Sequence, residues 1–206
     1  MTDLSKAALA VYAGNADRLI EAYEAVNADQ IFAPFLDLLP GAGATALDIG
    51  TGTGRDAAWL AARGLAVTAV EPTEGLRAAG ITRHGATLEW MDDILPNLPG
   101  LGARTFDLVV VNAVWHHLGD AERDRAARRL AALLRSDGLI LLSLRHGPEH
   151  PGQPVVALEA TAEVDRLAAA GLRLVRQETP DPHQGQNRAA GVTWIWLALR
   201  RDENDQ

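Results

Sequence analysis

The sequence predicts an α/β domain built on a doubly wound, mostly parallel sheet, preceded by a helical cap. From Thr45 onward, short apolar runs alternate with amphipathic stretches of helical period, which is the pattern of repeated βαβ units. The runs are apolar throughout, as expected for strands that crossover helices bury on both faces. A chain of 206 residues is long enough for one such domain with a sizeable core. We therefore expect a single domain over residues 1–206.

The first part of the chain, from Leu4 to about Leu39, is expected to be helical because its apolar residues recur at near-helical spacing. Gly14-Asn15 should interrupt this helix and Pro40-Gly41 should end it. The domain then divides into a helical segment over residues 1–40 and a sheet-based core over residues 44–201.

The core should contain seven strands. The first five are expected at Thr45–Ile49, Ala66–Glu71, Thr87–Met91, Asp107–Asn112 and Leu139–Leu144. Helices are expected between them at Arg55–Arg63, Thr73–Ala79 and Asp120–Leu134. The last of these should start at a capping Asp120, and its inward row should be Ala127, Leu130, Leu133 and Leu134. A final helix and two antiparallel strands complete the pattern, at Thr161–Ala170, Arg173–Glu178 and Val192–Arg200.

Composition excludes several classes of function. The net charge of −8 disfavours a nucleic-acid partner. The absence of cysteine excludes disulfides, thiolate metal sites and a cysteine nucleophile. The polar start of the chain has no secretory pattern, and no apolar run is long enough to cross a bilayer. We expect a cytoplasmic protein without a membrane partner, either a monomer or a homodimer.

A glycine-rich loop lies between the first expected strand and the first expected helix. Gly50, Gly52 and Gly54 stand at alternate positions, which lets the backbone turn tightly and approach a ligand closely. About 20 residues further on, the second strand ends in Glu71, whose carboxylate can accept both ribose hydroxyls of an adenosine. A dinucleotide fingerprint would have glycine at the sixth position, where this chain has Arg55. The glycine loop between a strand and a helix, together with Glu71 at the end of the next strand, predicts a nucleoside-binding site.

The same segment resembles motif I of the class I, Rossmann-like methyltransferases that use S-adenosylmethionine. Val70-Glu71-Pro72, Trp90–Pro96, Phe106–Leu118 and Leu134–Leu139 are similar to the later motifs of that family, in order. The last departs from the family pattern at Ser136-Asp137 but keeps Gly138. Gly52–Asp56, Ala113–Leu118 and Leu144–Pro148 resemble small uncharacterised bacterial members. The resemblance covers roughly residues 44 to 145.

The resemblance implies S-adenosylmethionine as cofactor and S-adenosylhomocysteine as product. In it, Glu71 binds the ribose, Asp92 accepts the adenine amino group, and the glycine loop holds the methionine end of the cofactor. The helix that carries Tyr12 and Asn15 would serve as a lid. The full set of expected cofactor residues is Tyr12, Asp48, Gly50, Thr51, Gly52, Gly54, Arg55, Glu71, Pro72, Asp92, Asp93, Ile94, Asn112, Ala113 and His117.

Candidate catalytic residues follow the fourth and fifth strands, where ligands of such sheets bind. His116 and His117 could act as a base, or one could pack beneath a helix while the other caps it. Arg145 could bind a substrate carboxylate or phosphate, or could be a solvated strand-end arginine. His146 and His150 have i, i+4 spacing, but the glycine and prolines around them disfavour a metal site, and none is expected.

Two other patterns have structural explanations. The arginines at 123, 125, 128, 129 and 135 are interleaved with acids and are expected on a solvated helix face. Trp194 and Trp196 alternate on a strand and are expected to pack on the sheet.

We therefore expect in-line methyl transfer to a small-molecule acceptor. The Asn-Pro-Pro-Tyr type of motif that grips planar amino groups is replaced by Asn112-Ala113-Val114-Trp115. Two alternatives stay open. One is a non-catalytic adenosyl-binding or regulatory protein. The other is an NAD-dependent oxidoreductase, disfavoured because the chain has no Tyr-x-x-x-Lys pair and Lys6 is its only lysine.

Overall fold

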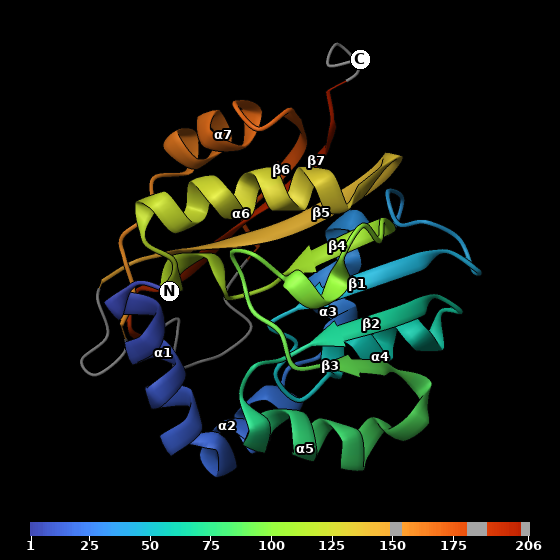
Figure 1. Cartoon of the computed structure of the whole chain (residues 1–206), viewed down its shortest axis with the longest axis vertical. Helices are drawn as coiled ribbons and strands as arrows, with labels where there is room; N and C mark the ends of the chain where they lie inside the picture. The colour runs from blue at the N-terminus through green and yellow to red at the C-terminus, as the bar shows by residue number, and fades with distance from the viewer. Residues whose placement is uncertain (149–153, 181–188, 203–206) are drawn as a thin grey trace.

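The computed structural model describes residues 1–148, 154–180 and 189–202. A seven-stranded sheet forms its centre, with the strand order β3-β2-β1-β4-β5-β7-β6 (Figure 1). The strands are β1 (Thr45–Ile49), β2 (Ala66–Val70), β3 (Glu89–Met91), β4 (Phe106–Val111), β5 (Leu134–His146), β6 (Leu172–Glu178) and β7 (Thr193–Arg201). β1 to β5 run parallel, and β7 pairs antiparallel with both β5 and β6. The expected doubly wound, mostly parallel sheet is confirmed.

Helices cover both faces of the sheet. They are α1 (Asp3–Gly14), α2 (Ala16–Glu24), α3 (Ala28–Phe32), α4 (Arg55–Ala62), α5 (Glu74–His84), α6 (Asp120–Leu133) and α7 (Ala160–Ala168). Short 3₁₀ turns are η1 (Ala33–Phe35), η2 (Gly85–Thr87), η3 (Pro99–Leu101) and η4 (Trp115–His117). None of the helices in the described part of the chain is long and apolar enough to cross a membrane.

The core divides into two clusters because successive residues of a strand point to opposite faces. On β4, Val109 and Val111 face one cluster together with Leu130 of α6 and Leu167 of α7. Leu108 and Val110 face the other, which α3, η1 and α4 complete. The central strands are buried on both sides, which explains why they are apolar throughout.

The N-terminal helices differ from the single interrupted helix that was expected. The break at Gly14-Asn15 is confirmed, since α1 ends at Gly14 and α2 begins at Ala16. A second break was missed, between α2 and α3. There the side chain of Asn27 accepts a hydrogen bond from the backbone N–H of Asp29 at 2.8 Å and starts α3. Figure 1 shows α1 beside the edge where the parallel strands end.

Two boundaries, one of a helix and one of a strand, differ from those expected. α5 continues through Gly80 to His84. A side chain at Gly80 would lie 2.2 Å from the ring of Trp90, so this glycine permits close packing and does not end the helix. β5 begins at Leu134, directly after α6, but its pairing with β4 is irregular up to Leu139, so the regular part of the strand starts where it was expected. Gly138 lies inside β5, where a side chain would lie 3.0 Å from the carbonyl oxygen of Phe106.

The start and the polar face of α6 also need correction. Asp120 is not the cap: Gly119 occupies the N-cap position, and its N–H donates to the Glu122 carboxylate at 3.2 Å. The inward row of Ala127, Leu130, Leu133 and Leu134 is confirmed as buried. Arg123 is an exception to the solvated arginine face because it is only 5% exposed.

Candidate functional site

The glycine loop between β1 and α4 turns back through three residues of positive φ. Gly50, Gly52 and Gly54 have φ values of 68°, 60° and 82°, which residues with a side chain rarely adopt. A Cβ atom at Gly50 would also lie 2.4 Å from Val114, in the segment between β4 and η4. The sequence pattern is therefore a steric requirement of this strand-to-helix connection.

Glu71 follows β2, and its buried carboxylate holds the glycine loop in place by hydrogen bonds to the backbone. One oxygen accepts a hydrogen bond from the Gly52 N–H at 2.9 Å, and the other accepts one from the Thr73 N–H at 2.8 Å. Burial raises the pKa of Glu71, while these hydrogen bonds oppose the rise. Each oxygen has further acceptor capacity, so the carboxylate can still accept two hydroxyl groups from a ligand.

Asp48 is the second buried carboxylate of the loop. It is 1% exposed and accepts a hydrogen bond from the Thr51 hydroxyl. Burial, followed by the negative charge of Asp56, raises the pKa of Asp48 to about 7. Asp56 is held by Arg55 at 2.8 Å and by the amide of Asn112 at 2.9 Å, so charges of both signs lie under the loop.

A large cavity opens above this loop. Its volume is about 830 Å³, and the ends of β1, β2, β4, β5 and β7 line it together with α1 and α2. Most of the expected cofactor residues line it: Tyr12, Asp48, Gly50, Thr51, Gly52, Arg55, Glu71, Pro72, Asp93, Ile94, Asn112, Ala113 and His117. So do the three candidate catalytic residues, His116, His117 and Arg145.

Two expected cofactor residues do not line the cavity. Gly54 instead makes room for Trp90, since a Cβ atom there would lie 2.6 Å from the ring. The Asp92 side chain is 68% exposed and pairs with Arg77 at 3.2 Å. Its neighbour Asp93 is buried and accepts hydrogen bonds from the Ile94 and Gly100 N–H groups, both at 2.8 Å. Of the two acids, the geometry places Asp93 beside the cavity.

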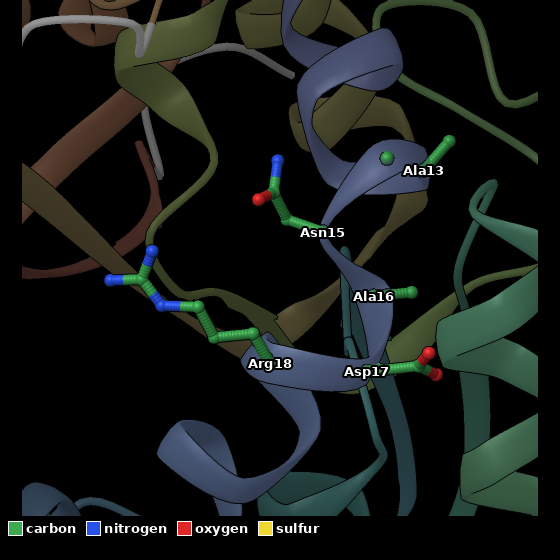
Figure 2. Close-up of a pocket in the computed structure, with 6 residues that line it drawn as sticks. Ala13, Asn15, Ala16, Asp17 and Arg18 are labelled. Carbon is green, nitrogen blue, oxygen red and sulfur yellow. The ribbon is translucent and has the colours of Figure 1, made fainter.

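A smaller hollow at the α1–α2 junction has no features of a site. Its volume is about 280 Å³, and only the consecutive residues Ala13 to Arg18 line it (Figure 2). Figure 2 shows Asn15 and Arg18 projecting from the same side of this junction, and both also line the large cavity. The amide of Asn15 donates to the carbonyl of Val11 at 2.8 Å.

Comparisons with known proteins agree with this architecture. A family model described as "Methyltransferase domain" matches residues 46–138. An uncharacterized methyltransferase of Geobacillus thermodenitrificans is 30% identical over 136 residues, or 64% of this chain and 62% of that protein. A second, from another Geobacillus strain, is 27% identical, with 64% and 63% covered. The aligned region thus spans a little over three fifths of these relatives.

Residues 46–138 of this chain are thus similar to methyltransferase domains. Solved structures share its fold. A 1,6-didemethyltoxoflavin-N1-methyltransferase from Burkholderia thailandensis, with S-adenosylhomocysteine bound, has a TM-score of 0.76 and 22% identity, over 96% of this chain and 88% of that one. A TehB-like methyltransferase from Corynebacterium glutamicum has a TM-score of 0.66 and 18% identity, over 94% and 98%. The [4+2]-cyclase SpnF has a TM-score of 0.66 and 16% identity, over 84% and 81%, so the fold alone does not decide the chemistry.

The two histidines of η4 have different surroundings. Nδ1 of His117 lies 2.8 Å from the carbonyl oxygen of Pro154, which can only accept, so this nitrogen carries the proton. Nε2 of His117 then accepts from the Tyr12 hydroxyl at 2.9 Å. His116 is 3% exposed, and its Nδ1 has no partner. Burial lowers the pKa of both rings, so both are neutral at neutral pH.

The structural roles considered for the candidate residues do not match their surroundings. Neither histidine caps α6, because Gly119 does. Arg145 is not a solvated strand-end arginine, since it is only 8% exposed. His146 is exposed and His150 lies outside the described residues. No group of three metal-ligating side chains occurs within the described ranges.

Sequence reasoning missed two contributions to this cavity. α2 packs directly on the glycine loop, where Arg55 donates to the carbonyl of Tyr23 at 2.8 Å and Thr53 donates to Glu24. Trp194 and Trp196 both line the cavity, because both project from the same face of β7. Trp194 also contacts the His116 ring at a centroid distance of 5.6 Å, and Trp196 packs on Phe32 and Phe35 as expected.

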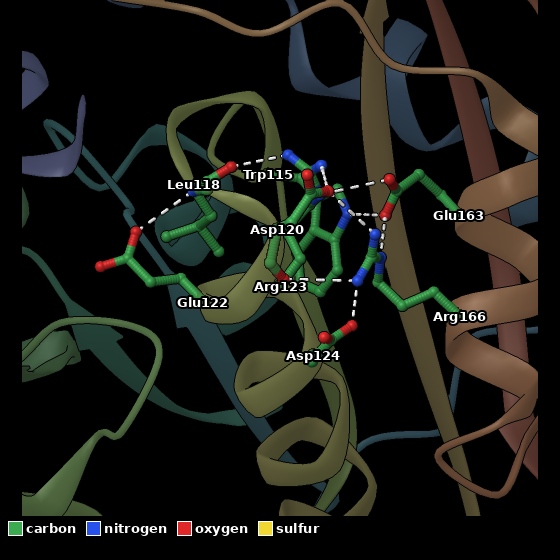
Figure 3. A network of polar contacts seen from close by, with 9 residues as sticks. Trp115, Leu118, Asp120, Glu122, Arg123, Asp124, Glu163 and Arg166 are labelled. Atoms are coloured by element: carbon green, nitrogen blue, oxygen red, sulfur yellow. Dashed lines mark hydrogen bonds and ion pairs between the residues drawn. The ribbon is translucent and has the colours of Figure 1, made fainter. Parts of the chain in front are cut away.

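A buried ionic cluster supports the turn η4 that carries both histidines (Figure 3). Glu163 of α7 accepts from the Trp115 indole N–H at 2.8 Å. The same carboxylate pairs with Arg123 at 3.2 Å and with Arg166 at 3.1 Å. Arg123 also donates to the carbonyl of Leu118 at 2.6 Å. η4 is therefore fixed from behind by α6 and α7.

Proposed function

We propose that this protein transfers a methyl group from S-adenosylmethionine to a small-molecule acceptor. The single observation that carries the proposal is the buried Glu71 carboxylate, which braces the glycine loop at the edge of a cavity large enough for a nucleoside and a second molecule. When bound, the cofactor would supply a methyl group on a sulfonium, which is a good leaving group.

Different residues of the cavity would bind different parts of the cofactor. Glu71 would accept the ribose hydroxyls, and the acids after β3 would face the adenine. The peptide groups of the glycine loop and Asp48 would face the methionine end. α1 and α2 would form a lid that excludes water. Orientation of the acceptor in line with the methyl–sulfur bond can supply on the order of 7–11 kcal/mol of the barrier.

The acceptor would occupy the end of the cavity beside His116, His117 and Arg145. A base is needed only if the acceptor loses a proton during attack, and neutral imidazoles with lowered pKa values are available for it. Small-molecule chemistry is supported by the fold neighbour that acts on 1,6-didemethyltoxoflavin and by the N-methyltransferase NodS from Bradyrhizobium japonicum, although both are distant relatives.

Calorimetric titration with S-adenosylhomocysteine tests the cofactor assignment. We expect binding to the wild-type protein and at least about tenfold weaker binding to Glu71→Ala, because charge-assisted hydrogen bonds to two hydroxyls are lost. Glu74→Ala removes the same charge from an exposed position three residues away and should bind normally. No binding to the wild type, or equal binding to Glu71→Ala, would contradict the proposal.

A labelled-methyl assay on a metabolite extract separates the alternatives. A methyltransferase would incorporate label into a small molecule, and Glu71→Ala would lose this activity. Tight cofactor binding without any labelled product would instead support a non-catalytic adenosyl-binding protein. Binding of NAD in preference to S-adenosylhomocysteine would support an oxidoreductase.

A further inference from the structure

We propose that the methyl acceptor is a small planar organic anion, whose charged oxygens pair with Arg145 and His116 and whose ring packs on Trp194. The inference rests on the proposed function and names the substrate class of the same cavity. Three side chains from η4, β5 and β7 carry it.

The first observation is a buried cation without a counter-charge. Arg145 lies near the end of β5, is 8% exposed and lines the cavity. Its guanidinium donates to the carbonyl oxygen of Pro148 at 2.8 Å, and no carboxylate of the described residues forms an ion pair with it. Burial alone lowers the pKa of Arg145, with no acid to offset it. A buried charge is normally paired, so a ligand anion is the missing partner.

The second observation is an unsatisfied polar atom in the same wall. Nδ1 of His116 is fully buried and has no hydrogen-bond partner, although His116 lines the cavity. Both nitrogens of His117 already have partners, in Tyr12 and Pro154. The positive charge of Arg145 helps to lower the pKa of both histidines, so all three side chains are close together. Because Nδ1 is closed to a ligand, the other ring nitrogen, Nε2, which forms no hydrogen bond with a described residue, is the atom that a ligand oxygen could use.

The third observation is an aromatic surface beside these groups. In the antiparallel pairing of β5 and β7, Arg145 lies directly opposite Trp194, so their side chains are neighbours on one face. Trp194 is only half-buried and contacts the His116 ring. A planar ligand whose acidic group meets Arg145 can therefore lie against the Trp194 ring.

Carboxylates outnumber cations at the end of the cavity beside the glycine loop. Asp48, Asp56, Glu71 and Asp93 line this end together with the guanidinium of Arg55. The end formed by η4, β5 and β7 contributes one guanidinium and two neutral imidazoles. A cationic cofactor suits the first end, and an anionic acceptor suits the second.

The test uses the full chain saturated with S-adenosylhomocysteine, titrated by calorimetry and by tryptophan fluorescence. The probes are 4-hydroxybenzoate, salicylate and nicotinate, each compared with its neutral amide, and acetate as a non-planar anion. We expect at least one aromatic carboxylate to bind at least tenfold more tightly than its amide and than acetate. Its binding should quench fluorescence in the wild type, and Trp194→Phe should reduce the quenching.

Two variants separate a specific ion pair from net charge. Arg145→Met should weaken carboxylate binding at least tenfold and abolish the preference over the amide. Arg125→Met removes the same charge from an exposed position on α6 and should change nothing. His116→Asn should also weaken carboxylate binding, with S-adenosylhomocysteine affinity unchanged in every variant.

Three results would overturn the inference: no aromatic carboxylate binds, amides bind as well as carboxylates, or Arg145→Met keeps the preference. Because S-adenosylhomocysteine binding is measured first, its absence would overturn the proposed function itself. Its presence without anion binding would overturn only the assignment of the acceptor.

Discussion

At the scale of single residues, the environment separates side chains of the same type. His116 and His117 are adjacent in sequence, and their ring centroids lie 4.1 Å apart. Only His117 has both nitrogens engaged, because α1 brings Tyr12 to one side and the segment after β5 brings Pro154 to the other. Asp92 and Asp93 differ in the same way, one exposed and paired with Arg77, the other buried beside the cavity.

Asp48 should couple ligand binding to pH. Its pKa rises from 3.8 to about 7 in the folded protein, so the folded state retains a proton between these values. The stability that this proton contributes is fully present below about pH 4 and is lost as the pH rises through 7. A ligand ammonium group beside Asp48 favours the carboxylate. We therefore expect S-adenosylhomocysteine binding to release a proton at pH 6 and to strengthen up to about pH 7.

Calorimetry at pH 6 in buffers of different ionisation enthalpy measures that proton. Asp48→Asn should release a smaller fraction of a proton and show a flatter pH dependence of affinity. Asp107→Asn is the control. This carboxylate lies near the start of β4, at the end of the strand that is far from the cavity. Hydrogen bonds from Thr45 and the charge of Arg135 lower its pKa, so it should not take part in proton release at pH 6. Equal proton release by wild type and Asp48→Asn would refute the coupling.

At the scale of elements, the short turn η4 depends on helices that are distant in sequence. Its Trp115 is fully buried and donates to Glu163 of α7, which also holds Arg123 of α6 (Figure 3). Three residues of 3₁₀ helix have little stability of their own. The position of both histidines therefore depends on this cluster.

Replacing Glu163 by glutamine should destabilise the fold by about 2 kcal/mol, because Arg123 then loses its buried counter-charge and keeps only the exposed carboxylate of Asp120. Urea denaturation measures the loss, and exposed Glu159→Gln is the control that should stay within about 0.5 kcal/mol of wild type. We further expect Glu163→Gln to weaken carboxylate probes more than S-adenosylhomocysteine, since η4 borders the acceptor end. An unchanged denaturation midpoint would show that the cluster contributes nothing to stability.

At the scale of the whole molecule, the N-terminal helices and the sheet-based core both line the cavity. The sheet supplies its floor, and α1 and α2 close one side, with Tyr12 bound to His117 and Arg55 bound to the backbone of Tyr23. A ligand in this cavity would contact the N-terminal helices and the core at once, so its binding should stabilise the whole folded chain.

S-adenosylhomocysteine at a hundredfold excess over its Kd should add about 2.7 kcal/mol of stability. For a chain of this size, that corresponds to a rise in Tm of about 5–10 °C. Differential scanning calorimetry measures the shift, and Glu71→Ala at the same ligand concentration should shift less. A wild-type Tm that does not respond to the ligand would count against a cofactor site in this cavity.

The sequence by itself determined the sheet, the helices that cross it and the glycine loop with Glu71, because these features depend on local periodicity and on conformations that only glycine adopts readily. It could not decide which acid after β3 lies beside the cavity, which histidine keeps a free nitrogen, or that Trp194 joins Arg145 there. Those outcomes depend on the register of β5 with β7 and on how α1, α2 and α7 pack. Only the tertiary structure decided them, because side chains far apart in sequence must meet before burial can change their chemistry.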